Sequence, residues 1–304
     1  MSRASEVALA AARRPAVAGA FYPADPDELA DLVDRLLEAA RPPDEAVAAS
    51  LAGLAGILVP HAGLAYSGRV AAVAWRLLAS VAPTDRATTI VMLGTNHGAW
   101  WLDGVGAWDA GAWRIPLGDV DVDEGLAAAI VALGPPFAID RDAHRSEHSI
   151  EVQLPFIHRA LRRARIVPLA IGAGTGERAI EAGRRLGGLL AERRTSGSQV
   201  SLAISTDMAH YPPAAVGAWV TEELAPIILV LDSARLAGRE ADIAASGMPG
   251  MACGMCGIEP TILGLAALRA MSVERGIRLA SGTSADAGGP TGRTVGYLAA
   301  AFPG

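Results

Sequence analysis

The sequence predicts an α/β fold of three layers, in which helices cover both faces of a mostly parallel central sheet. Three observations support this prediction. Short apolar runs with the length of buried strands alternate with longer helical segments, no internal repeat is visible, and no linker divides the chain. Such alternation is typical of parallel strands joined by crossover helices. We expect a single domain over residues 14–304, preceded by a disordered tail at residues 1–13.

Strands are expected where a short apolar run ends in a polar or glycine-containing turn, and helices where apolar residues recur every three or four positions. The expected strands, in chain order, are 54–59, 89–93, 137–140, 166–171, 199–204, 278–281 and 294–302. The expected helices are 26–40, 67–81, 121–133, 150–161, 177–193, those within 214–245, and 260–275.

Several local signals refine these elements. Ser67 is the expected N-cap of its helix, and Pro155 is expected to kink or restart the helix that contains it. Residues 41–45 and the glycine-rich stretch 247–257 are expected to be loops. Four tryptophans between residues 100 and 113, interspersed with glycine and aspartate, predict a hairpin or meander with aromatic packing.

Composition narrows the class of protein. Apolar residues make up 51% of the 304 residues, which is ample for a sizeable core. The net charge of −6 gives no reason to expect nucleic acid or an anionic membrane surface as a partner. Cys253 and Cys256 are the only cysteines, which excludes a disulfide framework and favours a reducing compartment.

We expect neither secretion nor membrane insertion. The apolar patch at residues 7–12 precedes Arg13 and Arg14, whereas a secretory signal has its positive charges first and a longer apolar core. The apolar run 227–231 is too short to span a bilayer and has acidic residues on both sides. We therefore expect a soluble protein of the cytoplasm.

Three polar clusters follow buried strands and carry most of the functional information. His61 lies in Pro-His-Ala-Gly, His97 in Thr-Asn-His-Gly, and Asp207 and His210 in Ser-Thr-Asp-Met-Ala-His. In an open parallel sheet, the segments past the carboxyl ends of the strands meet in one crevice, where ligands bind. We therefore expect His61 and His97 to chelate one metal ion, because two imidazoles at adjacent strand ends suit Zn, Fe or Cu. The alternative for each is a turn histidine that the backbone satisfies.

The motif Cys253-Gly-Met-Cys256 has three interpretations. A redox pair of the thioredoxin type should follow a strand, whereas this motif follows a glycine-rich loop. A structural zinc half-site needs a second cysteine pair, which the chain lacks. In the third interpretation one thiolate joins two histidines around a metal ion. Cys256 is favoured for this because it is nearer the next helix, whose dipole would lower its pKa.

For the remaining polar candidates, the alternative to a functional role is a purely structural one. Asp207 is expected to orient a metal-bound imidazole or to bind the metal itself, and otherwise to cap a helix or turn. His210, three residues further on, is expected to act as a general acid or base. His144 and His158 are interpreted as surface or helix-face residues.

In their order along the chain these clusters resemble the MEMO family, known in bacteria and archaea as AmmeMemoRadiSam system protein B. The resemblance runs from about residue 14 to the C-terminus, and its most specific block is EHSIEVQLPF at 147–156. Leu64 and Ala65 depart from the family's usual aromatic-containing pair. The other matching stretches are RPAVAGAFYP at 14–23, PHAG at 60–63, YSG at 66–68, GTNH at 94–97, PLG at 116–118, DMAHY at 207–211, CG at 256–257 with Pro260, and VGY at 295–297.

The resemblance implies the fold of the class III extradiol dioxygenases, which hold non-haem Fe(II) with two histidines and one glutamate. His61 and His97 match the two ligand histidines, Cys256 falls where the dioxygenases have glutamate, and His210 matches their acid/base. Fe(II) is the implied metal, with Cu or Zn as alternatives. Because a thiolate is softer and more electron-donating than a carboxylate, the dioxygenase reaction does not transfer with the fold.

We therefore expect a MEMO-family metal-binding protein, acting as a mononuclear non-haem iron oxidoreductase on a small substrate. Tyr66, Glu147 and His148 are expected to contact that substrate, and Trp100, Trp101 and Tyr66 to wall the pocket. One alternative is a non-catalytic metal- or peptide-binding module that serves a radical SAM or AMMECR-type partner, as the family name implies. Another is a zinc hydrolase that uses the two histidines, the cysteine and a bound water.

Overall fold

The structure is a computed structural model that describes residues 12–41 and 53–304. Within these residues eight strands form one sheet, in the order β10-β11-β2-β9-β3-β8-β4-β7. The four central strands are parallel and almost entirely buried, as expected for a sheet covered on both faces. They are β2 (Leu54–Val59), β9 (Val200–Ser205), β3 (Thr89–Thr95) and β8 (Arg165–Ile171). The predicted α/β fold with a mostly parallel sheet is confirmed.

Shorter or antiparallel strands complete the sheet on both sides of this parallel centre. On one side β11 (Gly296–Pro303) pairs antiparallel with β2 and with β10 (Ile277–Thr283). On the other side β4 (Val105–Ala107) is antiparallel to β8 and parallel to β7 (Phe137–Ile139). A separate small sheet contains β1 (Ala12–Arg13), β5 (Ala112–Ile115) and β6 (Gly118–Asp121).

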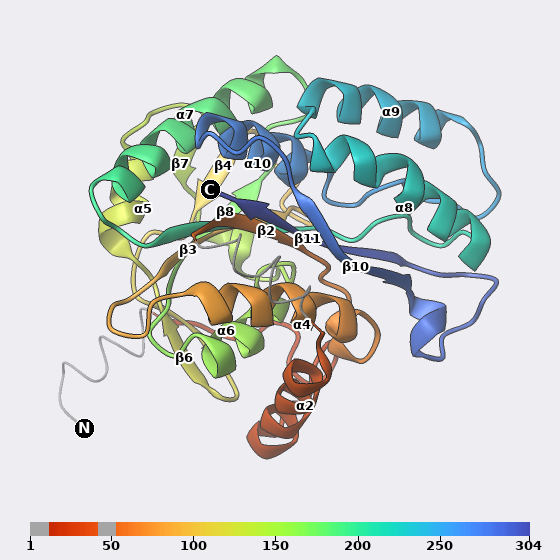
Figure 1. Cartoon of the computed structure of the whole chain (residues 1–304), viewed down its shortest axis with the longest axis horizontal. Helices are drawn as coiled ribbons and strands as arrows, with labels where there is room; N and C mark the ends of the chain where they lie inside the picture. The colour runs from red at the N-terminus through yellow and green to blue at the C-terminus, as the bar shows by residue number, and fades with distance from the viewer. Residues whose placement is uncertain (1–11, 42–52) are drawn as a thin grey trace.

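Helices cover both faces of the main sheet (Figure 1), which gives the three layers predicted from the sequence. One face carries α2 (Pro26–Ala39), α4 (Leu64–Val81) and α6 (Leu154–Ala160). The other carries α7 (Glu177–Thr195), α8 (Ala214–Leu229), α9 (Ser233–Ala245) and α10 (Ile258–Ala270), while α5 (Glu124–Val131) packs beside β7 and β8. In the described part of the chain, no helix combines the length and apolar character needed to cross a bilayer.

α7 and α10 pack at close range because α7 has glycines at the contact. A Cβ at Gly183 would lie 2.2 Å from the carbonyl oxygen of Leu263, and one at Gly187 would lie 2.2 Å from that of Ala267. Any side chain at these positions would force the helices apart. The close contact fixes α10 on the sheet, and with it the segment just before the helix, which carries Cys256.

The start of α4 differs from the prediction. The helix begins at Leu64, and Ser67 is not its N-cap but a buried residue of the first turn. The Ser67 hydroxyl donates to the carbonyl of Ala62 at 2.6 Å, so this polar group is satisfied inside the fold. Of the loop predicted at 41–45, all residues after Arg41 lie outside the described residues.

The start of α6 also needs correction. We expected a helix from about residue 150, but residues Glu151–Gln153 form a 3-10 turn and α6 begins at Leu154. Pro155 occupies the first turn of α6, where a missing N–H costs nothing, so the predicted restart at this proline is confirmed. The segment before α6 is therefore not part of a regular helix. It forms turns, and its side chains point in different directions.

The tryptophan-rich segment divides between core and surface. β5 and β6 form a hairpin as predicted, and Trp108 and Trp113 are buried, whereas Trp100 and Trp101 are exposed. His144, interpreted above as a surface or helix-face residue, is fully buried. Its Nε2 donates to a backbone carbonyl at 2.8 Å and its ring packs edge-on against Trp113. That interpretation was wrong because Trp108 and Trp113 pack against the histidine ring and exclude solvent from it.

A buried ion pair fastens the N-terminal segment to the block before α6. Arg13 and Glu151 side chains are 1% and 0% exposed, and their charged atoms lie 2.6 Å apart. Glu151 also accepts from the backbone N–H groups of Ala16 and Val17 and from the Tyr22 hydroxyl. The predicted tail at residues 1–13 is therefore too long, because β1 belongs to the fold; residues 1–11 lie outside the described residues.

We predict that Glu151→Ala lowers the free energy of unfolding by about 3–5 kcal/mol, because the buried Arg13 would keep its charge without a partner. Denaturant unfolding measures this loss. The control is Arg114→Ala, which breaks an exposed ion pair with Asp119 and should change stability little. Equal losses in the two variants would contradict the assigned role of Glu151.

Candidate metal centre

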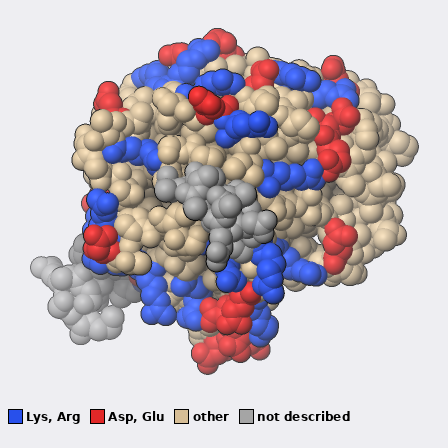
Figure 2. Space-filling view, viewed as in Figure 1, with Lys and Arg blue, Asp and Glu red and all other residues tan. Residues whose placement is uncertain are grey.

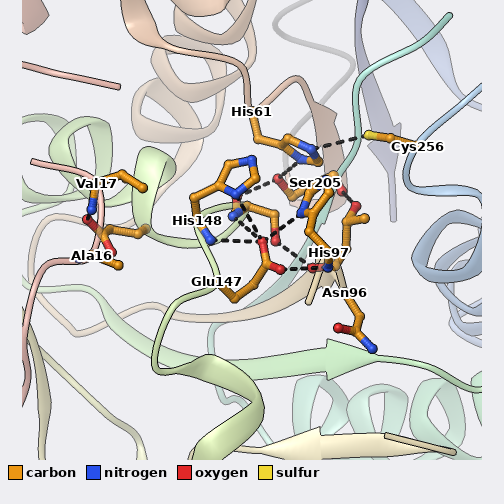
Figure 3. Close-up of polar contacts among 12 residues, drawn as sticks. Ala16, Val17, His61, Asn96, His97, Glu147, His148, Ser205 and Cys256 are labelled. Atoms are coloured by element: carbon orange, nitrogen blue, oxygen red, sulfur yellow. Dashed lines mark hydrogen bonds and ion pairs between the residues drawn. The ribbon is translucent and has the colours of Figure 1, made fainter. Parts of the chain in front are cut away.

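Two strand ends bring the predicted ligands His61 and His97 together, and Figure 3 shows both rings beside that of His148. His61 follows β2 and His97 follows β3, and both strands are parallel to β9, so all three end at the same edge of the sheet. The ring centroid of His61 lies 5.2 Å from that of His97 and 5.4 Å from that of His148. The rings of His97 and His148 stack at 4.3 Å. Three imidazoles therefore surround one point at the carboxyl edge.

His61 is the buried centre of this group. Its backbone N–H donates to Asp207 Oδ1 at 2.8 Å, and its Nδ1 lies 3.0 Å from the Ser205 hydroxyl. Its Nε2 lies 3.2 Å from Cys256 Sγ. Burial, together with the neighbouring histidines, holds the pKa of His61 well below its usual range. The ring is therefore neutral near pH 7 and can offer one nitrogen to a metal ion.

His97 is oriented by a buried carboxylate. Glu147 Oε1 lies 2.9 Å from His97 Nδ1, and Glu147 Oε2 accepts from the His97 backbone N–H at 2.8 Å. Burial alone would raise the pKa of Glu147, but the hydrogen bond from His97 and the nearby histidines hold it far below its usual range. Since an ionised carboxylate only accepts, Nδ1 is the donor and Nε2 is free to bind a metal.

Glu147 thus lies beside His97 rather than free in the pocket, where we expected it to contact substrate. It is buried, and it also accepts from the backbone N–H groups of His148 and Ser149 at 2.8 Å. His148 does border the histidine group, and burial lowers its pKa to about 4. A neutral His148 is a candidate ligand as well as a candidate substrate contact.

Cys256 is the thiol that faces the histidines. Its Sγ accepts from the backbone N–H of Asp207 at 3.3 Å in addition to its contact with His61. Burial and the neighbouring Asp207 raise the pKa of the Cys256 thiol well above its usual value. This is the opposite of the lowering expected from the α10 dipole, because desolvation of a buried thiolate outweighs the helix end. A metal ion would supply the missing positive charge.

Cys253 has a different environment. Its carbonyl accepts from the His210 backbone N–H, and burial raises the pKa of its thiol to about 11. In the part of the chain that the structure describes, Cys253 belongs to neither of the two groups of side chains able to share one ion. The geometry therefore favours Cys256 over Cys253 as the thiol of the site.

Two overlapping sets of donors share His61. One contains His61, His97 and His148, and the other contains His61, Asp207 and Cys256; within each set the donor atoms lie within 4.8 Å of one another. The predicted ligands His61, His97 and Cys256 are thus divided between the two sets. Imidazole nitrogens and a thiolate suit Fe, Zn or Cu, so the donors present fit the implied metal.

Asp207 and His210 lie on one segment after β9. Asp207 Oδ1 accepts from the backbone N–H groups of His61 and Ala62, and burial raises the pKa of Asp207 to about 7. His210 Nδ1 donates to the Met208 carbonyl at 3.0 Å, which leaves Nε2 facing Asp207 Oδ2 at 4.0 Å. Asp207 therefore holds the His61 backbone in place with one oxygen, while its other oxygen lies near His210 without a direct hydrogen bond.

Exposed aromatic side chains surround this edge of the sheet. Tyr66 lies in the first turn of α4 and is 48% exposed, Trp100 is 90% exposed, and Trp101 packs edge-on against Trp100. A cavity of about 200 Å³ lies between Trp100, Cys256 and the start of α10. Trp100 therefore lines a cavity that Cys256 also borders, whereas Tyr66 does not line it.

Two residues near His61 were not predicted from the sequence. Ser205 contacts His61 directly, and Gln153 reaches it through one hydrogen bond to Ser205. Ser205 and Gln153 are both fully buried polar side chains. The available signal for Ser205 was a polar residue at the end of an otherwise apolar strand, two positions before Asp207. Gln153 was counted within the helix expected from residue 150 and was given no role of its own.

The fold and these donors define an α/β protein with a histidine- and cysteine-containing candidate metal site at the carboxyl edge of its sheet. The family profile described as "Memo-like protein" matches residues 13–301. The chain belongs to this Memo family.

Relatives support this assignment along nearly the whole chain. A MEMO1 family protein of Methanopyrus kandleri is 34% identical over 297 residues, which cover 95% of this chain and 98% of the relative. A MEMO1 family protein of Methanocaldococcus jannaschii is 33% identical with the same coverage. The crystal structure of an uncharacterized protein, JW3007, from Escherichia coli K12 covers 82% of this chain and 99% of its own, with a TM-score of 0.52. At 17% identity that structure shows likeness of fold alone.

We predict that the affinity of the site for Zn²⁺ or Co²⁺ rises with pH. The Cys256 thiol has a raised pKa and must lose its proton to become a ligand, so protons compete with the metal more strongly as the pH falls. Cys256→Ser should weaken binding and flatten this pH dependence, whereas the matched control Cys253→Ser should alter neither. Competition with a chromophoric chelator at several pH values measures both, and equal effects of the two variants would contradict the assignment.

Proposed function

We propose that this protein is a mononuclear non-haem iron oxidoreductase that acts on a small substrate at the carboxyl edge of the sheet. His61, His97 and Cys256 would hold the metal, with His148 and Asp207 beside them. The observation that carries the proposal is the orientation of the two imidazoles. Each has its Nδ1 engaged by a buried group, Ser205 or Glu147, so each can present Nε2 to a shared ion.

The choice of iron rests on the resemblance to the extradiol dioxygenase fold and on the donor set. Two imidazoles and a thiolate also suit Zn and Cu, so metal analysis is part of the test. When bound, iron would supply redox chemistry and open positions for a small ligand. Cys256 stands where the dioxygenases have glutamate. The proposal therefore does not include the catechol-cleaving reaction of the dioxygenases.

Asp207 and His210 would carry out proton transfer in the site. Because burial brings the pKa of Asp207 to about 7, its carboxyl group can hold or release a proton near neutral pH. His210 Nε2 lies 4.0 Å from Asp207 Oδ2 and the His210 side chain is 19% exposed. That separation is too long for a hydrogen bond, so a bridging water or a small rotation of the imidazole would carry the proton between the buried carboxyl group and the solvent side. His210 would then be the acid or base that serves the substrate.

A binding module is the second candidate. The observation that favours it is an aromatic rim, which we define as Tyr66, Trp100, Trp101 and Tyr211. All four are at least 40% exposed, and each follows a histidine of the site by no more than five residues. Such a rim suits a partner surface as well as a substrate, and a radical SAM or AMMECR-type protein in the cytoplasm is the partner class that the resemblance implies.

We predict that protein loaded anaerobically with Fe(II) binds one iron per chain and consumes oxygen when ascorbate supplies electrons. His210→Ala should retain iron and slow oxygen uptake by about 10²–10⁴-fold, the usual contribution of a general acid or base. The matched control is His158→Ala, which removes a half-buried histidine of α6 and should leave uptake unchanged.

The paired replacement His61→Ala with Cys256→Ala should abolish stoichiometric iron by elemental analysis. Full iron loading in that double variant would refute the proposed site. Full loading of the unaltered protein with no oxygen uptake above that of free iron would instead favour the binding module.

A further inference from the structure

We infer that Ser205 and Gln153 are positioning residues that select the Nδ1–H tautomer of His61 and so leave its Nε2 bare toward Cys256. The inference about the tautomer stands on the hydrogen bonds alone. Its consequence for metal binding rests on the proposed function.

The Ser205 hydroxyl determines where the His61 proton lies. Its oxygen is 2.7 Å from the Ser149 carbonyl oxygen, 3.0 Å from His61 Nδ1 and 3.3 Å from Gln153 Nε2. A hydroxyl has one hydrogen, and a carbonyl can only accept. Among the described residues the Ser149 carbonyl has no other hydrogen-bond donor, so the hydroxyl hydrogen goes there. His61 Nδ1 must then be the donor to the Ser205 oxygen.

Gln153 keeps the hydroxyl in this orientation. Its Oε1 accepts from the indole N–H of Trp75 at 2.8 Å, which can only donate. Its Nε2 therefore points the other way, toward the Pro60 carbonyl at 2.8 Å and the Ser205 oxygen. A flipped amide would set oxygen against a carbonyl and NH₂ against the indole N–H, so this orientation is fixed by its surroundings.

The network controls both the backbone and the ring of His61. Gln153 holds the carbonyl of the preceding residue, Pro60, and through Ser205 it holds Nδ1. Trp75, Gln153 and Ser205 are each 0% exposed, and His61 is 1% exposed. Free histidine in water favours the Nε2–H tautomer, which would block the nitrogen that faces Cys256. The buried network reverses this preference before any ligand arrives.

The test is long-range ¹H–¹⁵N spectroscopy of histidine side chains in metal-free protein at mildly alkaline pH, where imidazoles are neutral. Protonated and bare ring nitrogens have well separated ¹⁵N shifts, and the His61→Asn spectrum identifies the His61 signals. We expect His61 to show a protonated Nδ1 and a bare Nε2. Ser205→Ala should transfer population to the Nε2–H tautomer and weaken Zn²⁺ binding by about 10–100-fold. Trp75→Phe, which frees the Gln153 amide but keeps a large ring, should shift the tautomer in the same direction.

The matched control is Ser201→Ala. Ser201 lies on the same strand, is buried, and likewise donates to a backbone carbonyl, that of Leu54. This variant should leave the tautomer and Zn²⁺ affinity unchanged. A protonated Nε2 in the unaltered protein, or an unchanged tautomer in both Ser205→Ala and Trp75→Phe, would overturn the inference. The expected tautomer in a protein that binds no metal would support the inference and count against the proposed function.

Discussion

The site depends on one constraint: polar groups at the ends of the buried parallel strands must find hydrogen-bond partners where water has little access. The backbone N–H of His61 emerges from β2 and is met by the Asp207 carboxylate from the end of β9. The Cys256 N–H in turn donates to the Asp207 carbonyl, which ties the segment before α10 to the same strand end. Chain segments that are distant in sequence are thus held together because each forms hydrogen bonds with the backbone groups of the other.

The block from Glu147 to Gln153 explains how one short segment can serve the whole site. Because it forms turns rather than a regular helix, its alternate polar residues reach different neighbours. Glu147 orients His97, the Ser149 carbonyl receives the Ser205 hydroxyl, Glu151 binds the N-terminal segment, and Gln153 positions His61. The face seen in Figure 2 carries interspersed positive and negative side chains. Glu147, Glu151 and Asp207, by contrast, are buried.

The two imidazoles at the centre are held by different means, with different consequences. His97 is held by an ionised carboxylate and its side chain is 34% exposed, so it lies on the open side of the site. His61 is held by neutral groups and is buried. A carboxylate partner makes an imidazole a stronger electron donor, whereas a hydroxyl partner mainly fixes its tautomer. Of the two rings, only that of His97 is therefore accessible from solvent.

The sequence by itself determined the buried central strands, the three-layer architecture and the strand-end histidines, but not the short strands β1 and β4. Buried parallel strands are continuous apolar runs, and side chains just past their carboxyl ends share one edge whatever the details of packing. It did not determine that Glu147 would turn inward to His97, that His144 would be buried, or that Ser205 and Gln153 would contact the site. Those outcomes depend on side-chain directions in non-helical turns and on partners more than 30 positions away, such as Gly106 for His144 and Trp75 for Gln153. Local sequence patterns carry no information on such pairings, and only the tertiary structure decides them.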